Sequence, residues 1–174
     1  MKKRILTWLL AISMLGSLLT VPAGAAAVTK FSDVSDSYTA TAVESLRLMG
    51  VLDGYGDGTF RPDTVLNRAQ FCKMAVYAMD GSGELGRYST VTIFPDVKPS
   101  HWASAYINMA SKKGIISGFA DGKFKPGQTV TAGQAVTILM RGLGYKDEDM
   151  GGVWPQSYMA EAQTNGLLKS TGIT

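Results

Sequence analysis

The chain has 174 residues and a formal net charge of +3, from 17 lysine and arginine residues against 14 aspartate and glutamate residues. Three of the basic residues lie at positions 2–4, before an uncharged apolar run over 5–21 and a tail of small residues over 22–27. This pattern predicts a signal peptide at 1–27, with an uncleaved anchor as the alternative. The remaining 14 basic and 14 acidic residues balance, so the composition does not support nucleic-acid binding.

Cysteine and histidine each occur once, at Cys72 and His101. An exported chain with a single cysteine has no internal disulfide, so it must be stable through packing alone. One cysteine and one histidine cannot form a standard zinc site, and no catalytic constellation is visible, so we expect no enzyme activity, cofactor or metal. We expect Cys72 to be a small buried apolar residue and His101 to be a surface neighbour of Trp102.

The first predicted unit, at 28–80, reads as helix, glycine-rich turn and helix. Apolar residues at helical spacing over 42–49 predict the first helix, and Gly50 follows where a left-handed cap is expected. An Asp-Gly pair at 57–58 then reverses the chain. Phe60 follows this turn, and we expect its ring to fill the space between the two helices.

A linker over 81–93 leads to a second copy at 94–144. Thirteen residues from Gly50 pair without a gap with the thirteen from Gly114, and the turn residues are retained. Equivalent pairs include Asp33 with Asp96, Gly54 with Gly118, and Phe60 with Phe124. Such self-similarity is the signature of a repeat protein, whose copies pack on each other to bury their apolar faces.

The second helix of both full copies begins with a capping signature. Asn67 lies three residues before Gln70, and Thr131 lies three residues before Gln134. A short polar residue followed at this distance by glutamine is a variant of the capping box, in which the two residues satisfy each other's backbone N–H groups. We therefore expect structural, helix-capping roles for these four residues.

A partial third copy is predicted at 145–174. Trp154 lies 52 residues after Trp102, and Gly166 opens a stretch equivalent to the one that Gly114 opens in the second copy. The sequence stops before the second helix of this copy, so we expect the third repeat to be incomplete. The predicted fold class is therefore all-α, built from packed helix-loop-helix repeats.

The combined pattern resembles the S-layer homology family. It consists of F-x-D-V, an aromatic residue that opens the first helix, the turn G-(I/V)-(I/L)-x-G-(F/Y)-x-D-G-x-F-x-P, and the second-helix motif (I/V/L)-(T/N)-R-A-(E/Q). The resemblance covers about residues 31–170. It implies a pseudo-threefold helical module without enzymatic activity. Its inter-repeat grooves would bind secondary cell-wall polymers of Gram-positive-type envelopes, which are often acidic glycans bearing pyruvate ketals.

The resemblance also assigns ligand-binding residues. The motif arginine is Arg68, the aromatic residue is Trp102, and the turn glycines are Gly54 and Gly118; these are expected to line the grooves. A guanidinium beside the free N–H groups of a helix start can hold a carboxylate in a bidentate manner. The structural alternative is that Arg68 pairs with a nearby acid such as Asp63.

Other candidate contacts also have structural alternatives. Trp102 and Tyr38 share one repeat position, where a ring either receives a sugar face or staples helix to helix; we favour the structural role for Tyr38. Asp33 and Asp96 each precede a first helix by a few residues; we expect them to cap that helix or order the loop, with a contact to a ligand hydroxyl as the lesser alternative. The second copy has Ala132 in place of the motif arginine, so its groove is expected to lack that charge.

The sequence thus predicts a secreted, non-covalent cell-wall anchoring module located at the cell wall or S-layer. Its partners would be cell-wall glycan and, as further candidates, S-layer or other envelope proteins. A helical-repeat scaffold for protein partners is one alternative, and the targeting segment of a longer envelope enzyme is another. Nucleic acid is not expected as a partner, and neither is a membrane after signal cleavage.

Overall fold

The computed structural model describes residues 30–80, 83–169 and 171, and the predicted signal peptide at 1–27 lies outside this part. Within it the chain forms five α-helices and no strand, which confirms the all-α class. The helices are α2 (Ser37–Leu48), α3 (Arg68–Asp80), α4 (Ser104–Lys112), α5 (Ala132–Gly142) and α6 (Gln156–Thr164), with short 3₁₀ helices η1 (Leu85–Tyr88) and η2 (Asp147–Asp149) between them. None of the described helices is both long and apolar enough to cross a membrane.

Side-chain caps hold the starts of α2, α3 and α5. Asn67 Oδ1 accepts the Gln70 N–H at 2.9 Å, while Gln70 Oε1 accepts the Asn67 N–H at 3.0 Å. Thr131 and Gln134 form the same reciprocal pair before α5. Helix α2 begins five residues before the apolar stripe seen in the sequence, because the Asp36 carboxylate caps it there.

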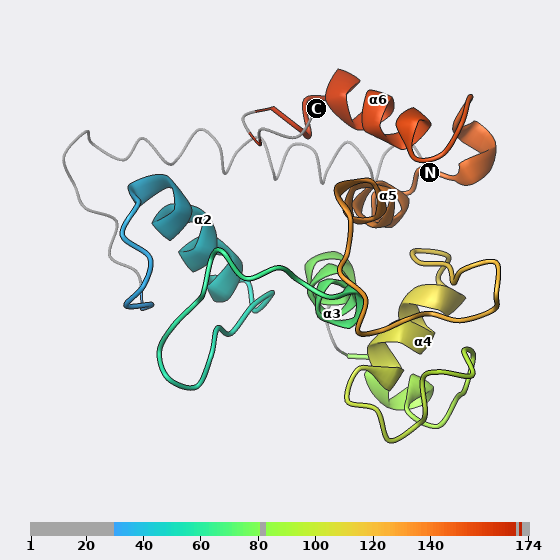
Figure 1. Cartoon of the computed structure of the whole chain (residues 1–174), viewed down its shortest axis with the longest axis horizontal. Helices are drawn as coiled ribbons and strands as arrows, with labels where there is room; N and C mark the ends of the chain where they lie inside the picture. The colour runs from blue at the N-terminus through green and yellow to red at the C-terminus, as the bar shows by residue number, and fades with distance from the viewer. Residues whose placement is uncertain (1–29, 81–82, 170, 172–174) are drawn as a thin grey trace.

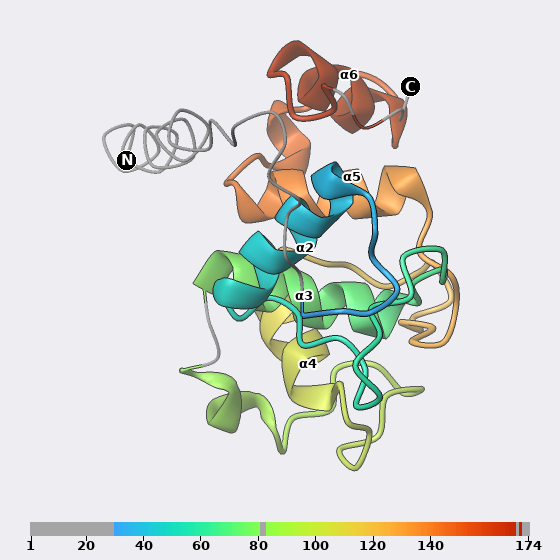
Figure 2. The same cartoon turned by 90° about the vertical axis from the view of Figure 1, so that its left-hand side faces the viewer.

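Helix α3 lies at the centre of the molecule. It packs against α4 and α5, and α5 in turn packs against α6 (Figures 1 and 2). Helix α2 packs on loop residues of its own repeat and on Met74 of α3. Helix α3 of the first repeat therefore supports α4 of the second, and α5 of the second repeat supports α6, so consecutive helix pairs share their apolar faces.

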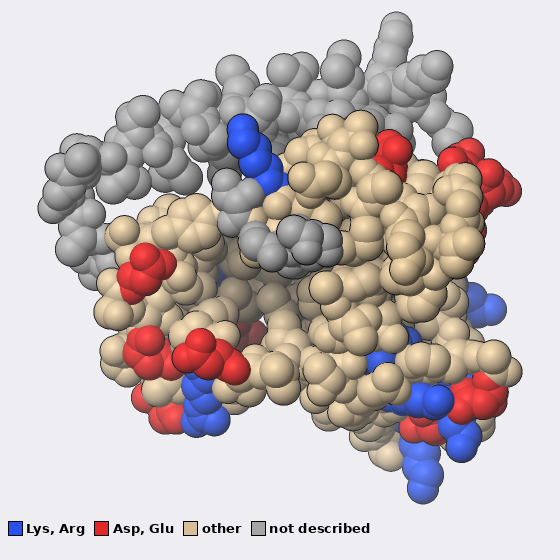
Figure 3. Space-filling model, turned by 45° about the horizontal axis from the view of Figure 1, so that its top comes forward, with Lys and Arg blue, Asp and Glu red and all other residues tan. Residues whose placement is uncertain are grey.

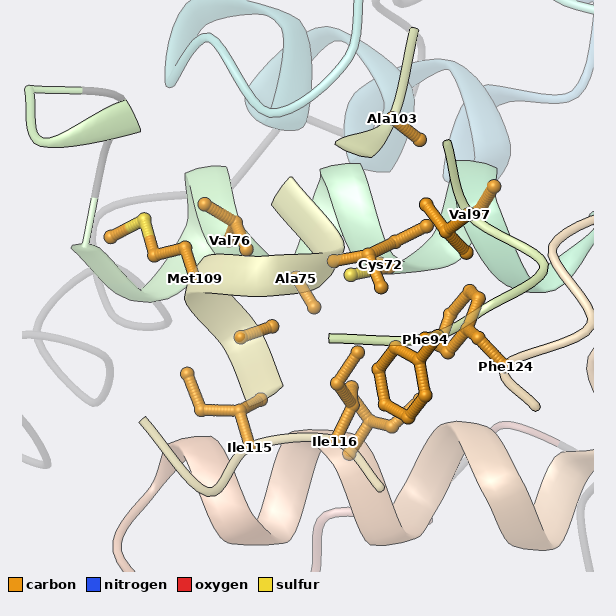
Figure 4. Packing of buried hydrophobic residues seen from close by; sticks show 14 residues of the cluster. Cys72, Ala75, Val76, Phe94, Val97, Ala103, Met109, Ile115, Ile116 and Phe124 are labelled. Atoms are coloured by element: carbon orange, nitrogen blue, oxygen red, sulfur yellow. The ribbon is translucent and has the colours of Figure 1, made fainter. Parts of the chain in front are cut away.

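The largest core cluster lies between α3, α4 and the turn of the second repeat (Figure 4). Phe94 and Phe124 pack together in it with ring centroids 5.5 Å apart, and Phe31 and Phe60 form the same pair in the first repeat at 5.7 Å. Cys72 is fully buried in this cluster, and burial raises the pKa of its thiol to about 12. Two smaller clusters hold α2 on its turn and α5 on α6.

Gly54 and Gly118 are required by the close packing of these rings on the turns. A Cβ atom on Gly118 would lie 2.6 Å from Cε1 of Phe94 and 2.9 Å from the carbonyl oxygen of Lys123. A Cβ atom on Gly54 would lie 2.0 Å from Cε1 of Phe31, and the φ of +72° at Gly54 also favours glycine. The phenylalanine of the F-x-D-V motif can therefore contact the turn backbone only if glycine stands there.

We expect Gly118→Ala to lower the free energy of unfolding by about 1–3 kcal/mol, because the added methyl group overpacks the turn against Phe94 and a backbone carbonyl. Urea unfolding followed by circular dichroism would measure the change. Gly127→Ala is the matched control, since a Cβ atom there would meet nothing within 4 Å. Equal destabilisation by both substitutions would contradict the steric explanation.

Candidate functional site

Among the described residues, two grooves share equivalent sequence positions. The groove between the second repeat and the following segment with η2 and α6, here called the C-terminal groove, has a volume of about 440 Å³. Its walls are the turn of the second repeat, α5, η2 and the start of α6, and one residue of α3 also lines it. Its polar and aromatic lining residues include Arg68, Ser117, Phe119, Gln134, Thr137, Arg141, Asp147, Trp154 and Tyr158.

The N-terminal groove has a volume of about 340 Å³ and lies between the turn of the first repeat, α3 and Trp102. Its polar and aromatic lining residues include Asp53, Tyr55, Arg61, Gln70, Lys73 and Trp102. The two grooves share repeat positions: Gly54 matches Gly118, Tyr55 matches Phe119, Gln70 matches Gln134, Lys73 matches Thr137, and Trp102 matches Trp154. The same repeat positions therefore build a groove twice.

The candidate ligand residues divide between these grooves. Arg68 and Gly118 line the C-terminal groove, whereas Gly54 and Trp102 line the N-terminal groove. The motif arginine of the first repeat therefore lines the groove between the second repeat and the segment with α6. The structure does not bring Arg68 and Trp102 into one site.

Asp33 and Asp96 line neither groove; each orders the turn of its own repeat. The two oxygens of Asp33 accept the N–H groups of Phe60 and Arg61, at 2.7 and 2.6 Å. Asp96 accepts the equivalent N–H groups of the second repeat, at 2.9 and 2.7 Å. The Phe60 N–H holds the pKa of Asp33 below its ordinary value; burial acts in the opposite direction, and the Arg61 N–H adds to the lowering. Both carboxylates thus order the turn that follows the first helix of their repeat, and neither caps that helix: Asp36 caps α2, and α4 has no side-chain cap.

Arg68 forms part of the floor of the C-terminal groove and is only 5% exposed. Its Nε–H donates to the carbonyl oxygen of Phe124 at 2.8 Å, and Nη2 donates to that of Ser117 at 3.2 Å. Its guanidinium carbon lies 4.6 Å from the ring centroid of Phe119 and 4.5 Å from that of Phe124. Burial lowers the pKa of Arg68. The guanidinium thus binds backbone and rings of the second repeat rather than Asp63.

The backbone N–H groups at the start of α3 are already hydrogen-bonded, which differs from the expectation that they are free. The Arg68 N–H donates to Gln128 O at 2.8 Å, and the Ala69 N–H donates to Pro126 O at 3.1 Å. The third N–H, that of Gln70, donates to the Asn67 side chain. The loop after the second turn crosses this helix end, so the expectation of an anion site at these N–H groups is wrong.

Each groove has one tryptophan ring that is about half exposed. Trp102 is 56% exposed and Trp154 is 52% exposed. The Trp154 Nε1–H donates to Thr137 Oγ1 at 3.0 Å, which fixes the indole beside α5. His101 stacks on Trp102 with ring centroids 5.7 Å apart. Exposed aromatic faces held in a concave site suit the apolar face of a sugar ring.

Arg141 supplies a second guanidinium to the C-terminal groove, which sequence reasoning missed. Its Nε–H and Nη2–H groups donate to the two carboxylate oxygens of Asp147, each at 2.8 Å, and its Nη1–H donates to Ser117 Oγ at 2.9 Å. Tyr158 also donates its hydroxyl to Asp147. The Arg141 side chain is 13% exposed, whereas that of Asp147 is 68% exposed. The second repeat therefore has a charged fork although it lacks the motif arginine.

The repeat comparison could not have found Arg141 because its equivalent in the first repeat is Tyr77. The usable signal was local: Arg141 lies in the last turn of a predicted helix, six residues before Asp147 in an acidic segment. Such a spacing allows an ion pair only if the chain turns back after the helix. Gly144, with φ +97°, provides that turn.

We expect the contribution of Asp147 to stability to disappear in acid. The Arg141 guanidinium and, to a lesser extent, the Tyr158 hydroxyl hold the pKa of Asp147 below its ordinary value of 3.8. A lowered folded-state pKa stabilises the fold above the unfolded-state value, and this stabilisation is lost as pH falls through the folded-state value. Asp147→Asn should therefore be less stable than wild type near pH 7 but not near about pH 2. Urea unfolding at both pH values measures this; a pH-independent difference would contradict it.

The N-terminal groove carries its own cations. Lys73 Nζ lies 3.4 Å from Asp53 Oδ2. Arg61 lies with its guanidinium carbon 4.0 Å from the centroid of the Tyr55 ring and donates from Nη2 to Asp57 at 2.6 Å. The Lys73 and Arg61 side chains are 33% and 48% exposed, respectively. Positive charge and an exposed indole therefore lie together in this groove as well.

The single histidine and the single cysteine of the chain are held in structural contacts. The His101 Nδ1 accepts the Ala103 N–H at 3.1 Å, and Cys72 is buried with a raised pKa. Among the described residues, no group of three or more His, Cys, Asp or Glu side chains is arranged to hold a metal ion. The grooves present exposed indoles, guanidinium groups and close turn backbone.

Comparison with known proteins agrees with this description. The family model described as "S-layer homology domain" matches residues 30–72 and 93–136, together half of the chain. The chain is 38% identical over 148 residues to a cell surface protein of Thermoanaerobacter kivui (83% of this chain, 19% of that protein). It is 33% identical over 146 residues to the middle cell wall protein of Brevibacillus brevis (83% and 14%), and 31% identical over 115 residues to a cellulosome-anchoring protein of Acetivibrio thermocellus (65% and 26%). It therefore spans about a quarter or less of the length of these relatives.

Proposed function

The chain belongs to the S-layer homology family, and from this membership we propose that it anchors a protein non-covalently to the cell wall by binding secondary cell-wall polymer in its inter-repeat grooves. Domains of this family anchor S-layer and other cell-wall proteins to the wall, and the relatives described above carry names that refer to the cell wall, the cell surface and anchoring. The polymer we propose is an acidic glycan, such as one bearing pyruvate ketals.

The observation that carries the proposal is the recurrence of one groove at two successive repeat boundaries. Each copy places an indole that is about half exposed next to cationic side chains and close turn backbone. A sugar ring can stack its C–H face on the indole, while a carboxylate on the same sugar reaches a guanidinium. A repeating polymer could therefore occupy equivalent sites along one chain.

Placed charges, rather than the overall charge, supply the attraction to an anion in this proposal. On the face in Figure 3, basic and acidic side chains lie beside each other and most of the surface is uncharged. The sequence after residue 27 is formally neutral. A long-range field would not steer an acidic polymer to such a surface, so short contacts in the grooves must provide the selectivity.

We assign the following roles within this proposal. Trp102 and Trp154 stack on sugar rings, and Arg141, Lys73 and Arg61 face the ligand with their charges. Arg68 holds the turn of the second repeat in place at the floor of the C-terminal groove. Gly54 and Gly118 allow the turn of each repeat to contact the phenylalanine of its F-x-D-V motif. Asp33 and Asp96 order the same turns. The chain then acts in binding, and any enzymatic activity would belong to another part of a longer protein.

Sedimentation with purified cell-wall sacculi tests the proposal. The chain should sediment with intact sacculi and remain in the supernatant when the secondary polymers have been removed chemically beforehand. Binding to peptidoglycan alone or to envelope proteins would instead survive that treatment. Equal sedimentation with both preparations would overturn the proposal and favour a scaffold that binds another wall component.

A further inference from the structure

The Arg141–Asp147 pair forms a wall between two hollows. Ser117, Arg141 and Asp147 line the C-terminal groove and also an adjoining hollow of about 470 Å³ on the side of Lys113 and Lys146. Arg141 and Asp147 therefore line both hollows as one ion pair. A ligand in the C-terminal groove would meet this pair next to Trp154 and Tyr158.

The two members of the pair are held very differently. Arg141 is fixed by the helix α5, by its hydrogen bond to Ser117 and by its low exposure of 13%. Asp147 lies in the three-residue 3₁₀ helix η2, and its side chain is 68% exposed. The segment around η2 lies between two glycines with positive φ, Gly144 and Gly152. The Arg141 guanidinium therefore has a fixed position in the groove. The Asp147 carboxylate can move away from it with little rearrangement of the core.

The contact that Asp147 makes is the contact expected of an acidic ligand. Both of its oxygens accept from the planar fork of Arg141 at 2.8 Å, which is the bidentate geometry of guanidinium with any carboxylate. The Tyr158 hydroxyl donates to one of these oxygens, so a third donor completes the position. The other guanidinium that lines this groove, Arg68, is turned to backbone carbonyls and rings.

We propose, resting on the function proposed above, that Asp147 is an internal counter-anion that the carboxylate of an acidic sugar displaces from Arg141 and Tyr158. The groove would then be closed to neutral sugars at this position, because they cannot replace a carboxylate on a guanidinium. It would admit only ligands whose own charge competes with Asp147. Because an acidic sugar must displace Asp147, its affinity is lower than it would be for an Arg141 guanidinium without an internal partner.

Asp147→Asn tests the proposal, because it retains the shape of the side chain and removes its charge. The probes are a methyl glycoside that bears a pyruvate ketal and the methyl ester of the same compound, which is neutral. The variant should bind the acid about tenfold more tightly than wild type and bind the ester no better. Asp149→Asn is the matched control, since Asp149 belongs to the same short helix and is exposed, and it should stay within about twofold of wild type.

A second measurement does not depend on the variant. In the wild-type chain, titration with the ketal acid should shift the Nε–H resonance of Arg141, while that of Arg87, which pairs with Glu84 at the surface, stays unchanged. The proposal is overturned if saturating acid leaves the Arg141 resonance in place, or if Asp147→Asn binds the acid no more tightly than wild type. If one of these results is obtained while the wild-type chain still sediments with sacculi, only the role of Asp147 is overturned and the proposed anchoring function is retained. Failure of wild type to sediment with sacculi overturns both.

Discussion

Arg68→Ala should lower the free energy of unfolding by about 2–4 kcal/mol, a larger effect than expected for any surface arginine. The substitution leaves the carbonyl oxygens of Phe124 and Ser117 without their donors and removes the guanidinium from between two aromatic rings. The second turn would lose its attachment to α3, so the C-terminal groove would lose its floor. Urea unfolding near neutral pH measures the change.

Two further variants separate the causes of this loss. Arg87→Ala removes an arginine side chain that is 79% exposed and should change stability by less than about 0.5 kcal/mol. Arg68→Lys keeps the charge but not the planar fork, so we expect a stability between those of wild type and Arg68→Ala. If Arg68→Ala were as stable as wild type and yet failed to bind sacculi, Arg68 would contact the ligand directly rather than support the turn.

Trp102→Ala and Trp154→Ala should each weaken binding to sacculi about tenfold or more, and the double variant should not sediment measurably. A tryptophan that serves as a hot spot of a binding interface costs about 2 kcal/mol or more on truncation, roughly a 30-fold change in affinity. Because both rings are about half exposed, the free energy of unfolding should change much less than the affinity. Sedimentation isotherms at several protein concentrations give both affinities.

Tyr38→Ala is the matched control for the two tryptophan variants. Tyr38 occupies the same repeat position, is 71% exposed and lines neither groove. Its removal should leave sedimentation unchanged within about twofold. A loss equal to that of Trp102→Ala would mean that the ligand binds outside the grooves, and it would contradict the assignment of both indoles.

Much of the local structure followed from the sequence because the signals were themselves local. The reciprocal caps of Asn67 with Gln70 and of Thr131 with Gln134 depend on a three-residue spacing that is readable in any chain. The all-α class and the apolar stripes followed from helical periodicity. The turn phenylalanines, expected between the two helices, each pack on the phenylalanine of the F-x-D-V motif in their own repeat.

The charged architecture of the grooves did not follow, because it depends on segments that meet only after folding. Nothing near Arg68 in the sequence indicates that its donors reach carbonyls 49 and 56 residues away. The loop over 126–128 uses the N–H groups that an isolated helix start would leave free. The Arg141–Asp147 fork lies where the two full repeats differ, so repeat comparison gave no partner for either residue.

The central claim is that both inter-repeat grooves bind the same acidic polymer, and the tryptophans allow a direct measurement. The chain from residue 28 onward contains two tryptophans, Trp102 and Trp154, and each groove holds one of them. Indole N–H resonances of the ¹⁵N-labelled protein, assigned with the two tryptophan variants, can be followed while polymer released from sacculi is added. We predict that both resonances shift and saturate together with the sedimentation isotherm. Unshifted indole resonances at a polymer concentration that fully prevents sedimentation would contradict the claim.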